Sequence, residues 1–328
     1  MRNNRLSKLA LLLAVLTFSG CAVMDKNIPG WTQYRVPDKT SELELAFRST
    51  GAGEPVLLIH GFGASSYSWR HIVEPLAQKN RVITIDLKGF GDSPKPRDDA
   101  YSVYEQARLV RNFILENDLK DLHIVGHSYG GGVALAVSIY LANSNPGLQK
   151  SLVLIDSVAY PQELPGFVKI LATPVLGPLI TYAVPNTFQV KDLLQKVYFN
   201  DDLIPQEAVD HYAADLDKPD AKYALLTSAR QMLPADLQQF SDNYARLTLP
   251  TLIIWSREDE IVPLAVGKRL HENLPNSKLV IMSGVGHAVQ EEKPSLLLPH
   301  LRNFLEAVSH RTAITPSTRY LYPSDPQH

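Results

Sequence analysis

The chain has 328 residues, a single cysteine and a formal net charge of −2, with a hydrophobic fraction of 45% and a charged fraction of 20%. This composition is typical of a globular protein and excludes a disordered chain, and one cysteine excludes an internal disulfide framework or a zinc site built from several thiolates. The near-neutral charge gives no electrostatic footprint for nucleic acid, and the length suffices for one large domain with an inserted subdomain.

The first residues have the composition of an export signal. Arg2, Arg5 and Lys8 precede an apolar run at residues 9–18, and small residues follow it. This order of basic, apolar and small residues is typical of a secretory signal peptide. The run is too short to span a bilayer as a mature helix. We therefore expect residues 1–20 to be a cleaved signal peptide.

The only cysteine, Cys21, follows Phe18, Ser19 and Gly20 at the expected cleavage point. The arrangement resembles a bacterial lipobox, with Phe18 in place of the usual aliphatic residue, and the resemblance implies that Cys21 becomes a lipid-modified first residue. Several acyl chains on one residue anchor a protein stably, whereas one does not. We expect a lipid anchor on the bacterial cell envelope, at the outer membrane or periplasmic face, with residues 21–40 as a tether. The alternative is an ordinary secreted protein with a chance cysteine.

Short apolar runs alternate with helical patterns over residues 41–157 and 245–310. Runs of Val, Ile and Leu without polar alternation are typical of strands buried on both faces of a parallel sheet. These runs are Pro55–His60, Arg81–Asp86, Leu122–Gly126, Ser151–Asp156, Thr251–Trp255 and Lys278–Met282. Helical patterns occupy Tyr101–Asn117, Tyr129–Leu141, Leu264–Asn273 and Ser295–Val308, and Glu42–Arg48 alternates as an antiparallel edge strand does. The pattern predicts an α/β fold with a mainly parallel sheet.

The alternation stops at residues 158–244, which contain many prolines and several helical patterns but no strand pattern. A long insertion with its own helices predicts a helical cap. Its most apolar part is residues 166–184, where Pro174 and Pro178 would break a single helix, so a membrane span is not expected. The segment is either a set of helices packed on the core or a lid that also touches lipid. Residues 311–328 lack periodicity and are expected to form a loosely ordered tail.

Gly126-His127-Ser128-Tyr129-Gly130 is a G-x-S-x-G run between a predicted strand and a predicted helix. In this context Ser128 is expected on a strained turn that lifts its hydroxyl off the sheet, with small residues where the backbone crowds. The backbone N–H of Tyr129 would then face an oxyanion. The run His60-Gly61-Phe62-Gly63, after an earlier strand, would supply the N–H of Phe62 as a second donor, each worth about 3 kcal/mol.

Two further polar residues follow predicted strands. Asp259 lies just beyond one strand and His287 just beyond the next, so both fall at the same sheet edge as Ser128. His287 can take the Ser128 proton and return it to a leaving group, and Asp259 would fix the imidazole tautomer. Asp156 also ends a strand and is the reserve acid. His127 is expected to point away, because neighbours on a tight turn diverge.

These motifs, in this order, resemble the α/β-hydrolase fold family over about residues 40–310. Asp86–Ser93 is similar to the family's D-x-x-G-x-G-x-S loop, which we interpret as structural. Trp255–Pro263 resembles its acid segment and Gly284–His287 its histidine loop. By register with the family's acid segment, the resemblance selects Asp259 over its acidic neighbours Glu258 and Glu260. In the family the nucleophile comes first, then the acid, then the histidine. It also implies a cap inserted after the sixth strand of the family's fold.

The expected function is that of a serine hydrolase that cleaves carboxylic esters, as an esterase or lipase, through an acyl-enzyme. Ser128 in the nucleophile position argues against dehalogenase and epoxide hydrolase chemistry, since resembling proteins with those activities carry Asp there. No metal or nucleotide motif occurs, so no cofactor is expected. Carbon–carbon hydrolysis of ring-cleavage products, a lactonase or a perhydrolase remain alternatives, as does an inactive envelope binding protein.

Overall fold

The computed structural model describes residues 43–310. The signal peptide, the lipid site at Cys21, the tether and the tail at 311–328 lie outside the described residues, so those expectations stay predictions.

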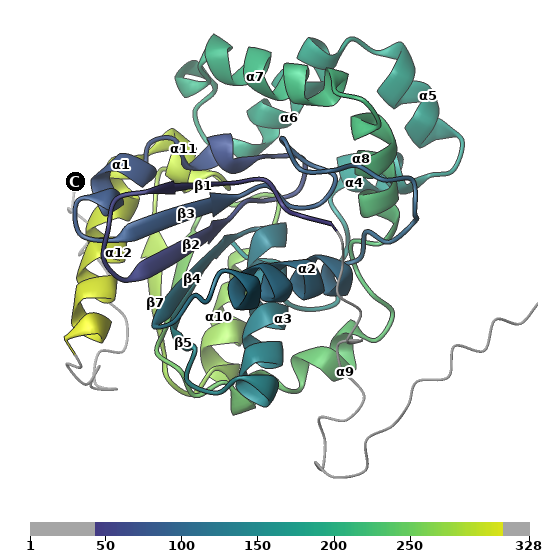
Figure 1. Cartoon of the computed structure of the whole chain (residues 1–328). Coiled ribbons are helices and arrows are strands. Elements are labelled where there is room, and N and C mark those ends of the chain that lie inside the picture. The colour runs from purple at the N-terminus through teal and green to yellow at the C-terminus, as the bar shows by residue number, and fades with distance from the viewer. Residues whose placement is uncertain (1–42, 311–328) are drawn as a thin grey trace, which may run out of the picture. The chain divides into compact units, whose positions relative to one another are not determined.

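A seven-stranded sheet has the order β1-β3-β2-β4-β5-β6-β7 (Figure 1). Its strands are β1 (Phe47–Thr50), β2 (Pro55–Ile59), β3 (Arg81–Ile85), β4 (Leu122–His127), β5 (Gln149–Ile155), β6 (Thr251–Ser256) and β7 (Ser277–Met282). Only β1 is antiparallel to its neighbour, β3, and all other pairs are parallel. The predicted α/β fold with a mainly parallel sheet is confirmed.

The edge strand is displaced from its predicted position. It covers Phe47–Thr50, whereas the polar alternation indicated Glu42–Arg48. Its first three residues are exposed, so no buried face selects its bounds, and pairing of its backbone with Val82–Ile85 determines where it lies. A strand specified by backbone pairing alone leaves little hydrophobic pattern in the sequence.

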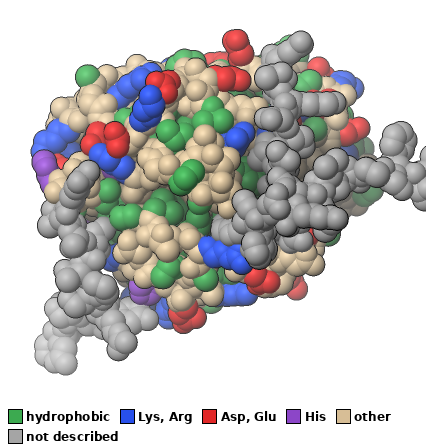
Figure 2. Space-filling view, turned by 60° about the horizontal axis from the view of Figure 1, so that its bottom comes forward, with side chains coloured by type: hydrophobic (Ala, Val, Ile, Leu, Met, Phe, Trp, Pro, Cys, Tyr) green, Lys and Arg blue, Asp and Glu red, His purple; other side chains and the backbone are tan. Residues whose placement is uncertain are grey.

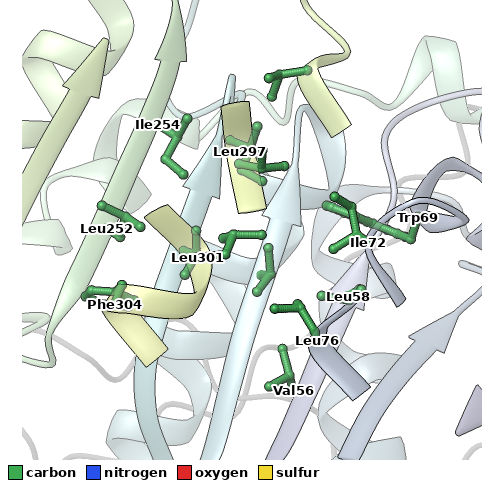
Figure 3. Close-up of a cluster of buried hydrophobic side chains, with 14 of the residues drawn as sticks. Val56, Leu58, Trp69, Ile72, Leu76, Leu252, Ile254, Leu297, Leu301 and Phe304 are labelled. Carbon is green, nitrogen blue, oxygen red and sulfur yellow. The ribbon is translucent and has the colours of Figure 1, made fainter. Parts of the chain in front are cut away.

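Helices cover both faces of the sheet. One face carries α1 (Val73–Ala77) and α12 (Pro294–Ser309), and the other carries α2 (Val103–Glu116), α3 (Tyr129–Ser144) and α10 (Leu264–Asn273). Figure 3 shows part of the core under α1 and α12: Phe304 of α12 lies beside Leu252 of β6, and Leu76 of α1 lies beside Val56 of β2. The labelled members of this buried cluster include Leu297, Leu301, Phe304, Leu252, Ile254, Val56 and Leu58. Burial on both faces explains why the central strands lack polar alternation.

The segment between β5 and β6 is helical. It contains α4 (Gly166–Ala172), α5 (Leu176–Ala183), α6 (Asn186–Val197), α7 (Gln206–Asp217), α8 (Ala221–Arg230) and α9 (Leu237–Ser241), with short 3₁₀ turns at Asp201–Leu203 and Tyr244–Arg246. Helices α4 to α8 gather at the upper right in Figure 1. The segment follows the fifth strand of the described residues. A 3₁₀ turn, Ser66–Trp69, and α11 (Val289–Glu292) complete the elements.

The two prolines of the apolar stretch behave differently. Pro174 lies between α4 and α5 and ends the first helix, as predicted. Pro178 does not break a helix, because it is the third residue of α5, where the backbone N–H has no intrahelical partner. The expectation for Pro178 was therefore wrong.

The charged surface shows no separation of sign in the view of Figure 2, which brings the bottom of Figure 1 forward. Lys and Arg side chains alternate there with Asp and Glu. This distribution agrees with the near-neutral balance of the chain.

Candidate active site

Ser128 occupies the turn between β4 and α3. Its φ of 53° and ψ of −120° lie in a region that non-glycine residues rarely adopt. The turn is held because the Ser128 N–H donates to the Ile155 carbonyl at 2.9 Å and the Ser128 carbonyl accepts from the N–H groups of Gly131 and Val158. Such strain persists only where surrounding bonds over-determine it. The strand–turn–helix context predicted for the motif is therefore present.

The glycines of the motif are required by close backbone approach. A Cβ at Gly126 would lie 2.4 Å from the carbonyl oxygen of Gly130, and one at Gly130 would lie 2.3 Å from that of His60. Either contact would push α3 away from the strands that position Ser128. The spacing of small residues around the serine follows from this crowding.

Three buried side chains form a chain of hydrogen bonds. The Ser128 Oγ lies 2.8 Å from Nε2 of His287, and Nδ1 of His287 lies 2.8 Å from Oδ2 of Asp259. The other carboxylate oxygen of Asp259 accepts from the N–H groups of Ile261 and Val262. With Nδ1–H donating to the carboxylate, Nε2 is left as the acceptor for the Ser128 hydroxyl. The structure thus brings together the three residues that the sequence selected.

Asp156, the reserve acid, lies beside this chain and also accepts hydrogen bonds from Ser256. Its oxygens bond the backbone N–H of Ser256 at 2.7 Å and the Ser256 hydroxyl at 3.0 Å. One ligand atom from each of Asp156, Asp259 and His287 lies within 4.8 Å of the other two. Burial, and next the charge of Asp259, raise the pKa of Asp156 well above its ordinary value. Both effects favour the protonated form of Asp156.

His127 braces the loop that carries His287. Its Nε2 donates to the backbone carbonyl of His287 at 2.8 Å, and its Nδ1 accepts from Nε2 of Gln290 at 3.2 Å. Burial, together with the neighbouring His287, lowers the pKa of His127 well below its usual range. Both ring nitrogens are thus engaged in a neutral ring, which positions His287 and leaves no free base at His127.

Phe62 and Tyr129, the residues expected to supply the oxyanion donors, have neighbouring side chains. The rings of Phe62 and Tyr129 make an edge-to-face contact with centroids 6.4 Å apart, and both residues line the same cavity as Ser128. Within the described part of the chain, neither backbone N–H donates a hydrogen bond to another backbone group outside regular helices and strands. Both residues thus lie beside Ser128 at the cavity wall, and their N–H groups as oxyanion donors stay a prediction.

The other residues of the family-like motifs hold loops. The ring of His60 accepts from the Leu87 N–H at 3.0 Å and bonds the Gly61 carbonyl at 2.8 Å. The Asp86 carboxylate accepts from the N–H groups of Ser66 and Asp92, while the Ser93 hydroxyl donates to the Asp86 carbonyl. These contacts support the structural interpretation of the Asp86–Ser93 loop and give His60 a structural role as well.

An apolar cavity of about 310 Å³ lies between Ser128 and the helical segment. Its walls come from the helices after β5 and include Phe167, Ile170, Leu171, Ile180, Leu193, Leu194, Leu225 and Met232. The charged lining residues are Asp192 and Glu291, and no Lys or Arg of the described residues contributes to the lining. The cavity can therefore receive a neutral, largely apolar molecule whose reactive group reaches Ser128.

The sequence did not single out the polar cluster under this cavity. The Glu291 carboxylate accepts from Arg70 at 2.6 Å and from the hydroxyl of Tyr212 at 2.9 Å. Burial raises the pKa of Glu291, and the guanidinium of Arg70 opposes that rise. The three residues are far apart in the chain and show no motif spacing, so only the fold could reveal the cluster.

The model of the α/β-hydrolase fold family matches residues 54–294. The chain belongs to the α/β-hydrolase fold family.

Among curated members of this family, two resemble the chain at 31% identity. One is the uncharacterized hydrolase YugF of Bacillus subtilis (strain 168), over 77% of this chain and 90% of that protein. The other is a 2-hydroxy-6-oxononadienedioate/2-hydroxy-6-oxononatrienedioate hydrolase of Cupriavidus pinatubonensis, over 78% and 89%. The crystal structure of an α/β-hydrolase fold protein from Burkholderia ambifaria superposes with a TM-score of 0.69 at 26% identity, covering 79% of this chain and 93% of that one.

Proposed function

We propose that this α/β-hydrolase cleaves carboxylic ester bonds, with Ser128 as nucleophile, His287 as base and acid, and Asp259 as the group that orients His287. The observation that carries the proposal is the pair of 2.8 Å contacts linking these three buried side chains at one wall of an apolar cavity. A serine is a weak nucleophile until an oriented base removes its proton, and this arrangement supplies that base.

The first half of the reaction forms an acyl-enzyme. As the Ser128 Oγ attacks the ester carbonyl carbon, its proton passes to Nε2 of His287, and the carbonyl π electrons move onto oxygen. The N–H groups of Phe62 and Tyr129 stabilise that oxyanion, while the Asp259 carboxylate stabilises the imidazolium. The intermediate then expels the alcohol, which leaves with the proton from His287.

The second half returns the enzyme to its starting state. Water gives a proton to Nε2 of His287 and attacks the acyl carbon, forming a second tetrahedral oxyanion at the same donors. Its collapse breaks the bond to the Ser128 Oγ, which recovers the proton from His287. The carboxylic acid is released, and no cofactor takes part in either half.

The lining of the cavity favours a neutral ester over a dicarboxylate. Asp192 and Glu291 are its charged residues, and the Glu291 carboxylate is already paired with Arg70. A substrate carboxylate buried there would meet no cation, at a cost of several kcal/mol. Carbon–carbon hydrolysis of a dienedioate, the activity named for the Cupriavidus relative, uses a substrate with two carboxylates. We therefore place it second, with lactonase and perhydrolase activity.

The size of the cavity predicts the preferred chain length. Since a water molecule takes about 30 Å³ of liquid volume, 310 Å³ holds on the order of ten non-hydrogen atoms, the size of an octanoyl or decanoyl group whose alcohol part lies outside the cavity. Turnover of p-nitrophenyl esters is expected to rise from acetate to a maximum near octanoate and decanoate, and to fall for palmitate. The measurement is kcat/KM across the series, with Ser128→Ala as the control for background hydrolysis.

Two other results would replace this proposal. Turnover of a ring-cleavage dienoate without turnover of any ester would favour carbon–carbon hydrolysis. Inertness of the folded protein toward every ester and toward a fluorophosphonate probe would favour a binding role.

We also propose that the protein is anchored on the bacterial envelope by lipid on Cys21. The support is the sequence alone: basic residues, an apolar run and small residues directly precede this cysteine. Full-length protein expressed in bacteria should enter the membrane fraction, and Cys21→Ser should move most of it to the soluble or uncleaved form. Mass spectrometry of the N-terminal peptide would identify the lipid, and an unmodified Cys21 would contradict the proposal.

A further inference from the structure

Helix α5, the residue before it and the start of α6 expose a strip of large apolar side chains. The exposed fractions are 79% for Val175, 62% for Leu179, 59% for Tyr182 and 67% for Phe188 at the start of α6. In α5 these residues follow each other at intervals of three and four, so they lie on one face of the helix. Between Glu163 and Lys191 the chain has a single charged residue, Lys169. This strip, from Val175 to Phe188, contains no charged residue.

The strip is not the face by which α5 packs on the protein. Gly177 and Thr181, one turn apart, are the buried residues of this helix. A Cβ at Gly177 would lie 2.3 Å from the carbonyl oxygen of Leu171, so α5 is seated closely against the end of α4. The opposite face of α5 therefore points outward, and its apolar side chains remain mostly exposed to solvent.

The strip is continuous with the cavity that contains Ser128. Phe188 is two-thirds exposed and Ile170 is 39% exposed, yet both also line that cavity. Ile180, on the same helix as Leu179, lines it from within. A hydrophobic molecule that leaves an apolar phase at the strip could reach Ser128 without crossing water.

The edge of the strip has the side chains that bilayer interfaces favour. The Lys222 ammonium lies 5.4 Å from the ring centroid of Tyr182, and Lys169 lies on the outer side of α4, paired at 2.8 Å with the exposed Glu163. Aromatic residues with a polar tip, beside flexible lysines, sit at the level of lipid headgroups. Lysines there also attract anionic headgroups.

No single helix within residues 43–310 is long and apolar enough to cross a membrane, although α4 and α5 satisfy the length and composition as a pair. The pair is bent by 103°, and Val168, Gly177 and Thr181 are buried against the protein. A helix pair bent in this way fits the interfacial plane of a bilayer rather than a span.

We infer that the strip on α5 and the start of α6 docks on a phospholipid bilayer surface and passes apolar substrate from it into the Ser128 cavity. The docking stands on the exposed side chains alone, whereas the delivery of substrate rests on the proposed function. The surface that the strip binds is the acyl–headgroup boundary of a bilayer that contains anionic phospholipid. The two parts are separable, because docking can be measured in a protein whose nucleophile is removed.

The test places a polarity-sensitive fluorophore on the strip of the full chain. In a Cys21→Ser background, Leu176→Cys puts the label on α5, and Leu296→Cys puts it on α12 as a matched control. The two leucines are 43% and 41% exposed, and neither lines the cavity. Vesicles of phosphatidylcholine and phosphatidylglycerol should shift the emission of the α5 label to the blue and leave the α12 label unchanged. The same shift is expected with Ser128→Ala, which separates docking from catalysis.

A second variant removes the apolar strip without touching the cavity. Val175→Glu with Leu179→Glu should raise the vesicle concentration for half-maximal shift by about tenfold or more, while hydrolysis of a short soluble ester stays unchanged. Four outcomes would overturn the inference. In the first two, vesicles cause no emission shift or cause an equal shift at both labels. In the other two, the α5 label is already shifted without vesicles, either increasingly with protein concentration or equally at every protein concentration. The last two would identify a second copy or another segment of this chain as the occupant.

Discussion

Ser128→Ala is expected to lower kcat/KM for p-nitrophenyl octanoate by at least about 10⁴-fold, because no other hydroxyl lies within hydrogen-bonding distance of His287 among the described contacts. Residual turnover would come from binding and the oxyanion donors. The fluorophosphonate probe should label the parent protein and leave the variant unlabelled. Steady-state kinetics and probe labelling are the two measurements.

A matched variant, Ser128→Gly, separates the chemistry of the hydroxyl from the backbone of the turn. Both variants lose the contact to His287, but only glycine adopts a φ of 53° without strain. The strain relieved is about 1–3 kcal/mol, and the extra entropy of an unfolded glycine offsets about 0.5–1 kcal/mol of it. Ser128→Gly should therefore be equally inactive and have a higher melting temperature than Ser128→Ala. Substantial activity in either variant, with folding intact, would remove Ser128 from the proposed role.

The central sheet was predictable because burial on both faces leaves a direct record in the sequence. Val56–Ile59 and Leu252–Ile254 are continuous apolar runs because helices cover both sides of their strands. The edge strand Phe47–Thr50 has three exposed residues, so side-chain pattern could not fix its limits. Its position depends on backbone pairing with β3, which is a tertiary property.

The helical segment after β5 was predictable in kind and not in detail. Prolines mark three of its helix starts, since α4, α6 and α7 follow Pro165, Pro185 and Pro205 directly. A proline at a helix start supplies a favourable φ and lacks a donor that has no partner there. The C-terminal ends of these helices are not marked by a comparable residue. Pro178 shows that a proline within the first turn of a helix does not break it.

The candidate active site was also predictable only in part. Ser128, Asp259 and His287 were found because each follows a buried strand, and parallel strands end at one sheet edge. The cavity could not be found, because Phe167 of α4 and Leu225 of α8 meet only through the packing of helices on one another. Short motifs thus located the chemistry, while the shape that selects the substrate had to come from the fold.

Asp259→Asn is expected to lower kcat by about 10³- to 10⁴-fold with the fold intact. The hydrogen bonds around position 259 determine the orientation of the asparagine side-chain amide. Its oxygen must face the N–H groups of Ile261 and Val262, which both donate to Oδ1 of Asp259. Its NH₂ group then faces Nδ1 of His287, which is forced to accept and so carries its proton on Nε2. In that tautomer His287 cannot accept the proton of Ser128.

Asp156→Asn is the matched control, since it makes the same change one hydrogen bond away. An amide can accept from the Ser256 N–H and donate to the Ser256 hydroxyl, and Asn tolerates the positive φ of 45° at this position. Its kcat should stay within about tenfold of the parent. The reverse result, an inactive Asp156→Asn with an active Asp259→Asn, would make Asp156 the acid that orients His287.

The stability of Asp156→Asn relative to the parent is expected to depend on pH. Burial and the charge of Asp259 raise the pKa of Asp156 in the folded protein, whereas in the unfolded chain this carboxyl ionises near about pH 4. Above that pH the folded state keeps a proton that the unfolded state has lost, so this group's contribution to the free energy of unfolding falls as pH rises toward the folded-state pKa. Asparagine stays neutral and loses this dependence. Relative to the parent, Asp156→Asn should therefore gain stability as the pH rises above about 4. The measurement is urea unfolding at a series of pH values, and a difference in stability that stays constant with pH would show that Asp156 is ionised in the folded protein.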